Sequence, residues 1–201
     1  MRFGRLGCTT VAMTLLATAT LAQATAPVRV RGTIAELAGN SLTIKERNGQ
    51  SEEVTLDEPV TVTTVRRLAL EAIKPGSYIG VTARPAADGT LVALEVHAFP
   101  EEMRGVGEGN RPWDLEAGST MTNANVTGVV ESGDGSEVTL TYKDGSKTIR
   151  IPPTVPVVTF ASADRSDLKP GTPVFLIARS LDGKLHASRV TAGTSGVAPP
   201  M

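Results

Sequence analysis

The side chains best suited to metal binding lie together in the middle of the chain. His97, Glu101, Glu102, Glu108 and Asp114 fall within one short stretch, and imidazole and carboxylate groups suit zinc or similar divalent ions. Their spacing matches no fixed metal motif. One hypothesis is therefore a divalent metal held by His97, Glu101 and Glu108. The other, which we favour, is a histidine satisfied at a surface or interface, with no cofactor.

The same stretch holds the only tryptophan, Trp113, together with Phe99, Arg104 and Arg111. Large aromatic side chains usually anchor packing, and an arginine can grip a carboxylate with two parallel hydrogen bonds. We expect these four residues either to clamp the flanking regions together or to line a ligand site. The clamp is the favoured interpretation.

Signatures of covalent and phosphate chemistry are missing from the sequence. The glycine-rich run 105–109 lacks the Lys-Ser/Thr pair of a phosphate loop, and Ser119 lacks a Gly-x-Ser-x-Gly elbow. With only two histidines and one cysteine, a nucleophile-base pair is not expected. The 20 basic and 21 acidic residues also argue against a nucleic-acid partner. We predict a protein that is not an enzyme.

The first 24 residues have the pattern of a cleaved secretory signal. Arg2 and Arg5 precede an apolar run that ends in Ala22-Gln23-Ala24, a small-x-small cleavage site. The only cysteine, Cys8, lies inside this segment. We therefore predict export to the periplasm of a mature chain without a thiol and without a membrane span.

The remainder reads as two copies of one pattern. Lys74-Pro75-Gly76 recurs as Lys169-Pro170-Gly171, and Gly32-Thr33-Ile34 aligns with Gly128-Val129-Val130 at a shift of 96 residues. Apolar and polar residues alternate with a period of two, which predicts about six strands in each copy. They cover residues 28–34, 41–46, 53–56, 60–65, 78–83 and 91–98, then 126–130, 138–142, 147–151, 155–160, 174–178 and 185–190. Residues 66–73 and 161–168 have helical character.

A copy of about 70 residues laid out as a flat sheet would leave two open edges, so closure into a barrel is expected. We predict an all-β fold of two tandem small β-barrels that resemble the oligonucleotide/oligosaccharide-binding (OB) type. The first covers residues 28–98 and the second residues 126–192, joined by a docked irregular segment over 99–125. A disordered tail over 193–201 completes the prediction.

The central segment contains the motifs Phe99-Pro100-Glu101, Met103-Arg104-Gly105, Gly107-Glu108-Gly109, Arg111-Pro112-Trp113-Asp114-Leu115 and Gly118-Ser119-Thr120-Met121-Thr122-Asn123. Through these motifs the segment carries a resemblance. It resembles a group of exported proteobacterial proteins of unknown function, often automatically labelled metal ABC transporter permease, and the flanking copies are similar to a widespread bacterial barrel domain of unknown function. A permease crosses the bilayer with helices of about 20 apolar residues, and residues 25–201 contain no such stretch, so that label does not fit.

These observations predict a non-enzymatic periplasmic protein that acts as a structural or interaction module of the cell envelope, with an unidentified partner. The alternative is a periplasmic protein that binds a metal or another small ligand through the central segment around His97.

Overall fold

A computed structural model describes residues 26–133, 135–194 and 197–199. The signal-peptide prediction for residues 1–24 lies outside these described residues. The described chain is all-β, as predicted, and none of its helices is long and apolar enough to span a membrane. Its strands are β1 (Val28–Ala38), β2 (Ser41–Glu46), β3 (Ser51–Arg67), β4 (Tyr78–Pro85), β5 (Leu91–Ala98), β6 (Gly109–Pro112), β7 (Thr120–Ser132), β8 (Gly135–Tyr142), β9 (Gly145–Ile151), β10 (Val157–Ala163), β11 (Pro173–Leu181) and β12 (Lys184–Ala192).

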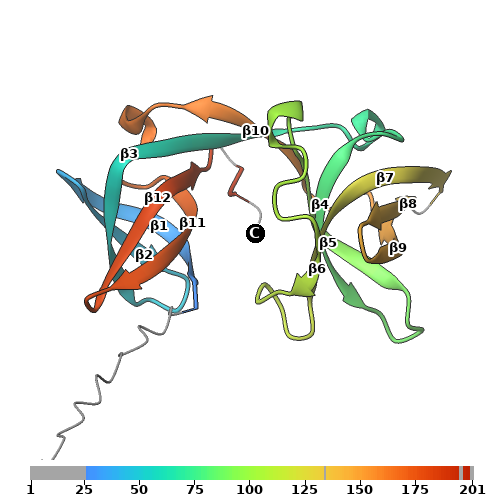
Figure 1. Ribbon diagram of the computed structural model, residues 1–201, viewed down its shortest axis with the longest axis horizontal. Coiled ribbons are helices and arrows are strands. Elements are labelled where there is room, and N and C mark those ends of the chain that lie inside the picture. Colours follow the sequence, from blue (N-terminus) through green and yellow to red (C-terminus); the bar gives the residue numbers. More distant parts are fainter. Residues whose placement is uncertain (1–25, 134, 195–196, 200–201) are drawn as a thin grey trace, which may run out of the picture.

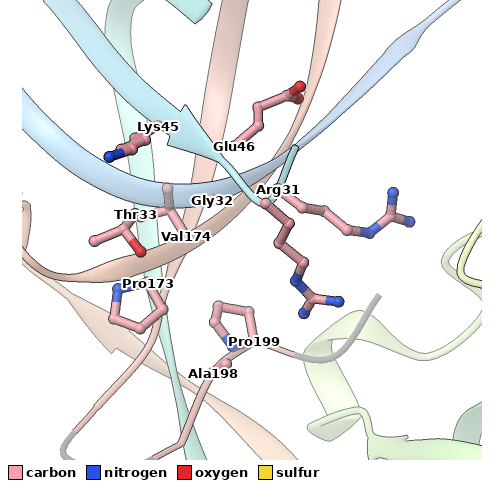
Figure 2. A pocket seen from close by; sticks show the side chains of 10 residues that line it. Arg31, Gly32, Thr33, Lys45, Glu46, Pro173, Val174, Ala198 and Pro199 are labelled. Carbon is pink, nitrogen blue, oxygen red and sulfur yellow. The ribbon is translucent and has the colours of Figure 1, made fainter. Parts of the chain in front are cut away.

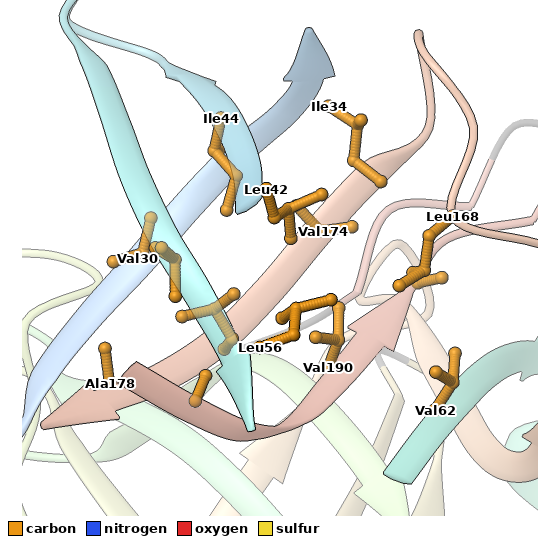
Figure 3. Close-up of a cluster of buried hydrophobic side chains, with 14 residues drawn as sticks. Val30, Ile34, Leu42, Ile44, Leu56, Val62, Leu168, Val174, Ala178 and Val190 are labelled. Atoms are coloured by element: carbon orange, nitrogen blue, oxygen red, sulfur yellow. The ribbon is translucent and has the colours of Figure 1, made fainter. Parts of the chain in front are cut away.

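Five strands form a closed barrel in the order β1, β2, β3, β12, β11 and back to β1. Neighbours are antiparallel except β3 and β12, which run parallel. Alternation along each strand sends every second side chain inward, so the barrel interior fills with aliphatic residues. Figure 3 shows this core, which includes Val30, Ile34, Leu42, Ile44, Leu56, Val62, Leu168, Val174, Ala178 and Val190.

The remaining long strands pair in the same order: β7, β8, β9, β5, β4 and back to β7. Here the parallel contact is between β5 and β9 and covers two residue pairs. This second set encloses its own cluster of buried side chains, among them Ile79, Val81, Leu140 and Ile149. Figure 1 shows the two sets side by side, with β3 and β10 crossing between them at the top of the view.

Each set draws strands from both halves of the chain. The closed barrel combines β1 to β3 with β11 and β12, while β4 and β5 of the first half pair with β7 and β9 of the second. The structure therefore differs from the expected boundaries, in which 28–98 and 126–192 each close a barrel of their own. Periodicity predicts which residues form strands, but partner choice depends on where the long strands β3 and β10 carry the chain.

The two Lys-Pro-Gly turns make this exchange visible. Gly76, with φ +92°, donates its amide to Val126 of β7, and Gly171, with φ +85°, donates to Ile34 of β1, each at 2.8 Å. Each of these two turns is thus hydrogen-bonded to a strand from the other half of the chain. Ile34 and Val126 are therefore equivalent positions, a shift of 92 residues rather than the expected 96 at this strand.

Three further expectations need correction. The helical stretches 66–73 and 161–168 shrink to the 3-10 turns Leu70–Ala72 and Arg165–Asp167, because the β3–β10 ladder extends both strands. The segment 99–125 is not wholly irregular, since it contains the 3-10 turn Glu101–Met103, β6 and the start of β7. In the tail expected to be disordered, Val197 pairs with Thr194 and packs against the cluster of Val65, Val158 and Phe160.

Candidate ligand-binding site

The floor of the candidate site is the outer face of the second strand set. Gly80 of β4 lies between His97 of β5 and Asn123 of β7 in the strand register. Its neighbours Ile79 and Val81 point into the core, so position 80 faces outward, toward the closed barrel. A Cβ atom at position 80 would lie 2.0 Å from Nε2 of His97 and 2.7 Å from Oδ1 of Asn123. Glycine is thus required for both polar side chains to lie over this strand.

His97 is enclosed by aromatic rings. Its imidazole meets Phe99 edge-on at a centroid distance of 4.8 Å and Phe160 at 5.5 Å. Burial, reinforced by the positive charge of Arg111, lowers the pKa of His97 from 6.5 to about 3. The ring is therefore neutral at physiological pH, and His97 is an interface residue between strands of both halves.

Trp113 packs against residues from both strand sets. Its cluster contains Met121 of β7 and Phe175 of β11, and the Arg29 guanidinium of β1 lies 4.0 Å from the centre of its ring. The adjacent carboxylate of Asp114 accepts hydrogen bonds from Arg31 at 2.7 Å and from Arg29 at 3.4 Å. The central segment thus touches the closed barrel and the second set at once.

The carboxylate of Asp114 stays ionised in this position. Burial raises its pKa, but the hydrogen bond from Arg31 and the charges of Arg31 and Arg29 outweigh burial and hold the pKa below its usual range. Asp114 is therefore engaged by the two arginines of β1 and is not available as a metal ligand.

The two arginines of the central segment have different surroundings. Arg104 makes a bidentate pair with Glu101, at 2.6 and 2.7 Å, and also donates to Asn125 and to the carbonyl of Gly76. Half-buried Arg111 donates to the carbonyl of Gly107 at 2.7 Å, and within the described chain it forms no salt bridge. Burial and the nearby charge of Arg29 lower the pKa of Arg111.

A pocket of about 400 Å³ opens between the two strand sets above this floor. Its volume is at the small end of the range for ligand sites, and most of its wall is apolar. Arg111 and Arg189 supply its positive charges, and the described residues that line it include no Asp or Glu. The wall is formed by Thr63, His97, Phe99, Met103, Val106, Gly107, Arg111, Trp113, Met121, Asn123, Phe160, Phe175, Leu176, Ile177, Ser188, Arg189 and Thr191.

Three buried polar atoms of this wall lack a hydrogen-bond partner among the described residues. They are Nδ1 of His97, Nε1 of Trp113 and Oδ1 of Asn123, and their residues are only 1%, 8% and 4% exposed. Buried polar groups are nearly always paired, so three exceptions around one pocket mark a place where a bound molecule would supply the partners.

The metal hypothesis is not supported by this arrangement. The carboxylate of Glu101 is committed to Arg104, whose hydrogen bond holds the Glu101 pKa below its usual range. Glu108 accepts from the backbone amide of Lys143 at 3.1 Å. Across the described ranges, no three His, Cys, Asp or Glu residues are grouped as a metal site would require. His97, Glu101 and Glu108 are thus not brought together.

Four of the residues singled out from the sequence line the pocket: His97, Phe99, Arg111 and Trp113. Arg104 does not line it, and instead donates hydrogen bonds to Glu101 and to the carbonyl of Gly76. Sequence reasoning missed Asn123, Met121, Phe160 and Phe175. Phe160 and Phe175 fall within strands predicted from the sequence, but alternation along a strand does not tell which face of a sheet meets a second sheet. Asn123 and Met121 stood out in the sequence only as members of the motif 118–123.

A second hollow of about 320 Å³ lies on the closed barrel, beside β1, β2 and the start of β11. Figure 2 shows Ala198 and Pro199 beside Pro173, with Arg31 and Lys45 nearby. None of the buried side-chain atoms without a hydrogen-bond partner belongs to its described lining. In this it differs from the pocket between the two strand sets.

A comparison with protein families, curated proteins and solved structures finds no match to the chain.

Proposed function

We propose that this protein is a non-enzymatic, exported binding protein that holds a small organic molecule in the pocket between its two strand sets. The observation that carries the proposal is that three residues in the wall of one pocket, His97, Trp113 and Asn123, each hold a buried polar atom with no hydrogen-bond partner among the described residues. Leaving a buried polar group without a partner costs about 1–3 kcal/mol. A ligand with matching groups recovers that free energy.

The clamp and the ligand site are two roles of the same segment. Trp113 and Asp114 connect the central segment to β1 and β11 of the closed barrel, and Trp113 also forms part of the pocket wall. A ligand in contact with both strand sets would add to this clamp, because binding to the folded state alone stabilises it. Ligand binding and envelope interaction are thus compatible functions.

We further propose that the second strand set is also an OB-like barrel, and that both arose by duplication followed by exchange of strands between the copies. The common order of strand pairing, the two separate cores and the reciprocal Lys-Pro-Gly turns support this origin. Export rests on the pattern of residues 1–24. Cleavage after Ala24 is tested by mass spectrometry of the protein recovered from the periplasm.

The methionines provide a direct test of binding. Met103 and Met121 line the pocket. We expect methyl-¹³C signals of Met103 and Met121 in residues 25–201 to shift on titration with 4-hydroxyphenylacetate, 4-hydroxyphenylacetamide or tyramine. A Ser188→Phe variant, which fills the exposed rim of the pocket, should suppress these shifts.

The matched control is Ser162→Phe, because Ser162 is exposed on β10 and does not line the pocket. It should bind as the wild type does. If none of the three probes shifts either pocket methionine at millimolar concentration, the proposed function is wrong.

A further inference from the structure

We infer that the natural ligand is a small organic acid with an apolar body and a hydroxyl group, its carboxylate bound by Arg111 and by the indole N–H of Trp113. This inference rests on the proposed binding function and names the chemical class of the ligand. It follows from three properties of the pocket: its charge, the types of its unpartnered atoms and the composition of its walls.

The charge of the pocket favours an anion. The described lining residues include two arginines and no carboxylate, and neither Arg111 nor Arg189 forms a salt bridge within the described chain. A half-buried guanidinium is stabilised by a planar anion that accepts two of its hydrogen bonds. An ammonium group would meet two positive charges and no counter-ion.

The unpartnered atoms define what else the ligand must carry. Nε1–H of Trp113 is only a donor and therefore needs an acceptor, whereas Oδ1 of Asn123 is an acceptor and needs a donor. The amide nitrogen of Asn123 already donates to the carbonyl of Val106 at 3.0 Å, which orients Oδ1. Nδ1 of neutral His97 takes either role, depending on the tautomer. A carboxylate together with a hydroxyl group satisfies this set.

Arg111 and Asn123 are close enough to act on one ligand. A Cβ atom at Gly107 would lie 3.2 Å from a terminal nitrogen of Arg111 and 3.2 Å from Nδ2 of Asn123. The two side chains therefore converge on the same glycine, at the edge of the pocket. A single small ligand can therefore reach Arg111 with its carboxylate and Asn123 with its hydroxyl group.

The walls favour an apolar, ring-sized body. Phe99, Phe160 and Phe175 line the pocket with Met103 and Met121, and the rings of Phe99 and Phe160 pack in a tilted arrangement at a centroid distance of 5.6 Å. Thioether and aromatic side chains accommodate an aromatic or branched aliphatic group. A phosphate monoester fits less well, because phosphate sites usually add several backbone amides.

A series of three probes of one shape tests the inference: 4-hydroxyphenylacetate, its neutral amide, and tyramine, which carries an ammonium group. Affinities are measured from the fluorescence of Trp113 and from the methionine methyl signals. We expect the acid to bind at least about tenfold more tightly than the amide, the difference that one charge-assisted hydrogen bond provides. Tyramine should bind more weakly than the amide.

Arg111→Gln should reduce affinity for the acid by about tenfold or more and leave affinity for the amide within about twofold. Arg66→Gln removes the same charge from an exposed residue outside the pocket and should leave all affinities unchanged. If Arg111→Gln fails to fold, the comparison of the acid, the amide and tyramine in the wild-type protein still tests the inference.

Equal affinity of the wild type for acid and amide would overturn the assignment to an organic acid while leaving the binding function in place. So would a tighter complex with tyramine. A folded Arg111→Gln variant that binds the acid as tightly as the wild type would also overturn it. If none of the three probes changes the fluorescence of Trp113 or the methyl signals of Met103 and Met121, the proposed binding function itself is wrong.

Discussion

Val65 of β3 and Phe160 of β10 lie directly opposite each other in one antiparallel ladder. They also hold matching places in the two halves of the chain, since the Lys-Pro-Gly turns that follow them are offset by the same 95 residues. Strands that correspond in sequence therefore pair with each other at the centre of the molecule. After this ladder the chain passes from one strand set into the other. As a result, β4 and β5 join the second set and β11 and β12 join the closed barrel.

The exchange predicts that neither half folds alone. Fragments 26–104 and 105–201 each lack strands needed to close either set, so each should be largely unfolded by circular dichroism and NMR. Mixing them should restore a folded 1:1 complex, because every missing strand is then present. Independent folding of fragment 26–104 into a stable barrel would show that the strands pair within each half.

The buried imidazole predicts a specific pH dependence of stability. The pKa of His97 is about 3 in the folded protein and has its ordinary value of 6.5 in the unfolded chain, so the unfolded state binds more protons between these values. The contribution of neutral His97 to the free energy of unfolding is therefore fully present above pH 6.5 and is lost as the pH falls toward 3. Between pH 7 and pH 5 the loss attributable to His97 is about 2 kcal/mol.

Urea unfolding at pH 7 and pH 5 measures this dependence in the wild type, His97→Phe and His97→Gln. Both variants should lose less stability than the wild type over this interval, whatever their stability at pH 7. In the wild type, the His97 ring signals should not titrate between pH 8 and pH 4.5 in NMR. A titration midpoint near 6 would contradict the burial of this residue.

Gly80 should tolerate no side chain. In Gly80→Ala the new methyl group collides with the imidazole of His97 and the amide of Asn123, so we expect a loss of about 1–3 kcal/mol in the free energy of unfolding. Because both polar groups must move, affinity for 4-hydroxyphenylacetate should fall as well. Gly128→Ala is the matched control, since its nearest neighbour would be Oγ1 of Thr139 at 3.5 Å. Equal stability of the two variants would show that the imidazole of His97 does not lie over Gly80.

Trp113 should report the integrity of the junction. It is buried against Met121 and Phe175, so its fluorescence maximum in the native protein should lie to the blue of free indole in water and move to the red on unfolding. Trp113→Ala should destabilise the protein by about 3–5 kcal/mol, as for other large buried side chains. A native spectrum identical to that in concentrated urea would show that the ring is not docked.

Much of the fold follows from local sequence patterns. Alternation at a period of two predicted most strands, and the turns at Gly76 and Gly171 both adopt the positive φ expected of glycine. The helical expectation failed because residues 66–67 and 161–163 join the β3–β10 ladder, a contact between residues about 95 positions apart. Such a long-range pairing overrides local propensity and leaves no trace in either segment alone.

The site was predictable only in part. The concentration of Phe99, Trp113 and Arg111 in one unrepeated segment indicated where a clamp or ligand site would form, because large apolar side chains rarely lie in a free linker. The role of His97 was open between metal ligand and satisfied interface residue. In the structure Phe99 and Phe160 enclose the imidazole, and burial together with the charge of Arg111 lowers its pKa. Its Nδ1 has no hydrogen-bond partner among the described residues, so the histidine is buried at an interface without being satisfied there.

Local chemistry along the chain was thus enough to establish an all-β protein with a distinctive central segment, since strand alternation and glycine turns depend on near neighbours. The partners of β4 and β5, the opposition of β3 to β10, and the meeting of Asn123 with His97 over Gly80 depend on the path of the whole chain. Side chains so distant in sequence come together only when both strand sets have formed. The pocket, where the described residues leave three buried polar atoms without partners and Arg111 without a salt bridge, is therefore a property of the folded protein.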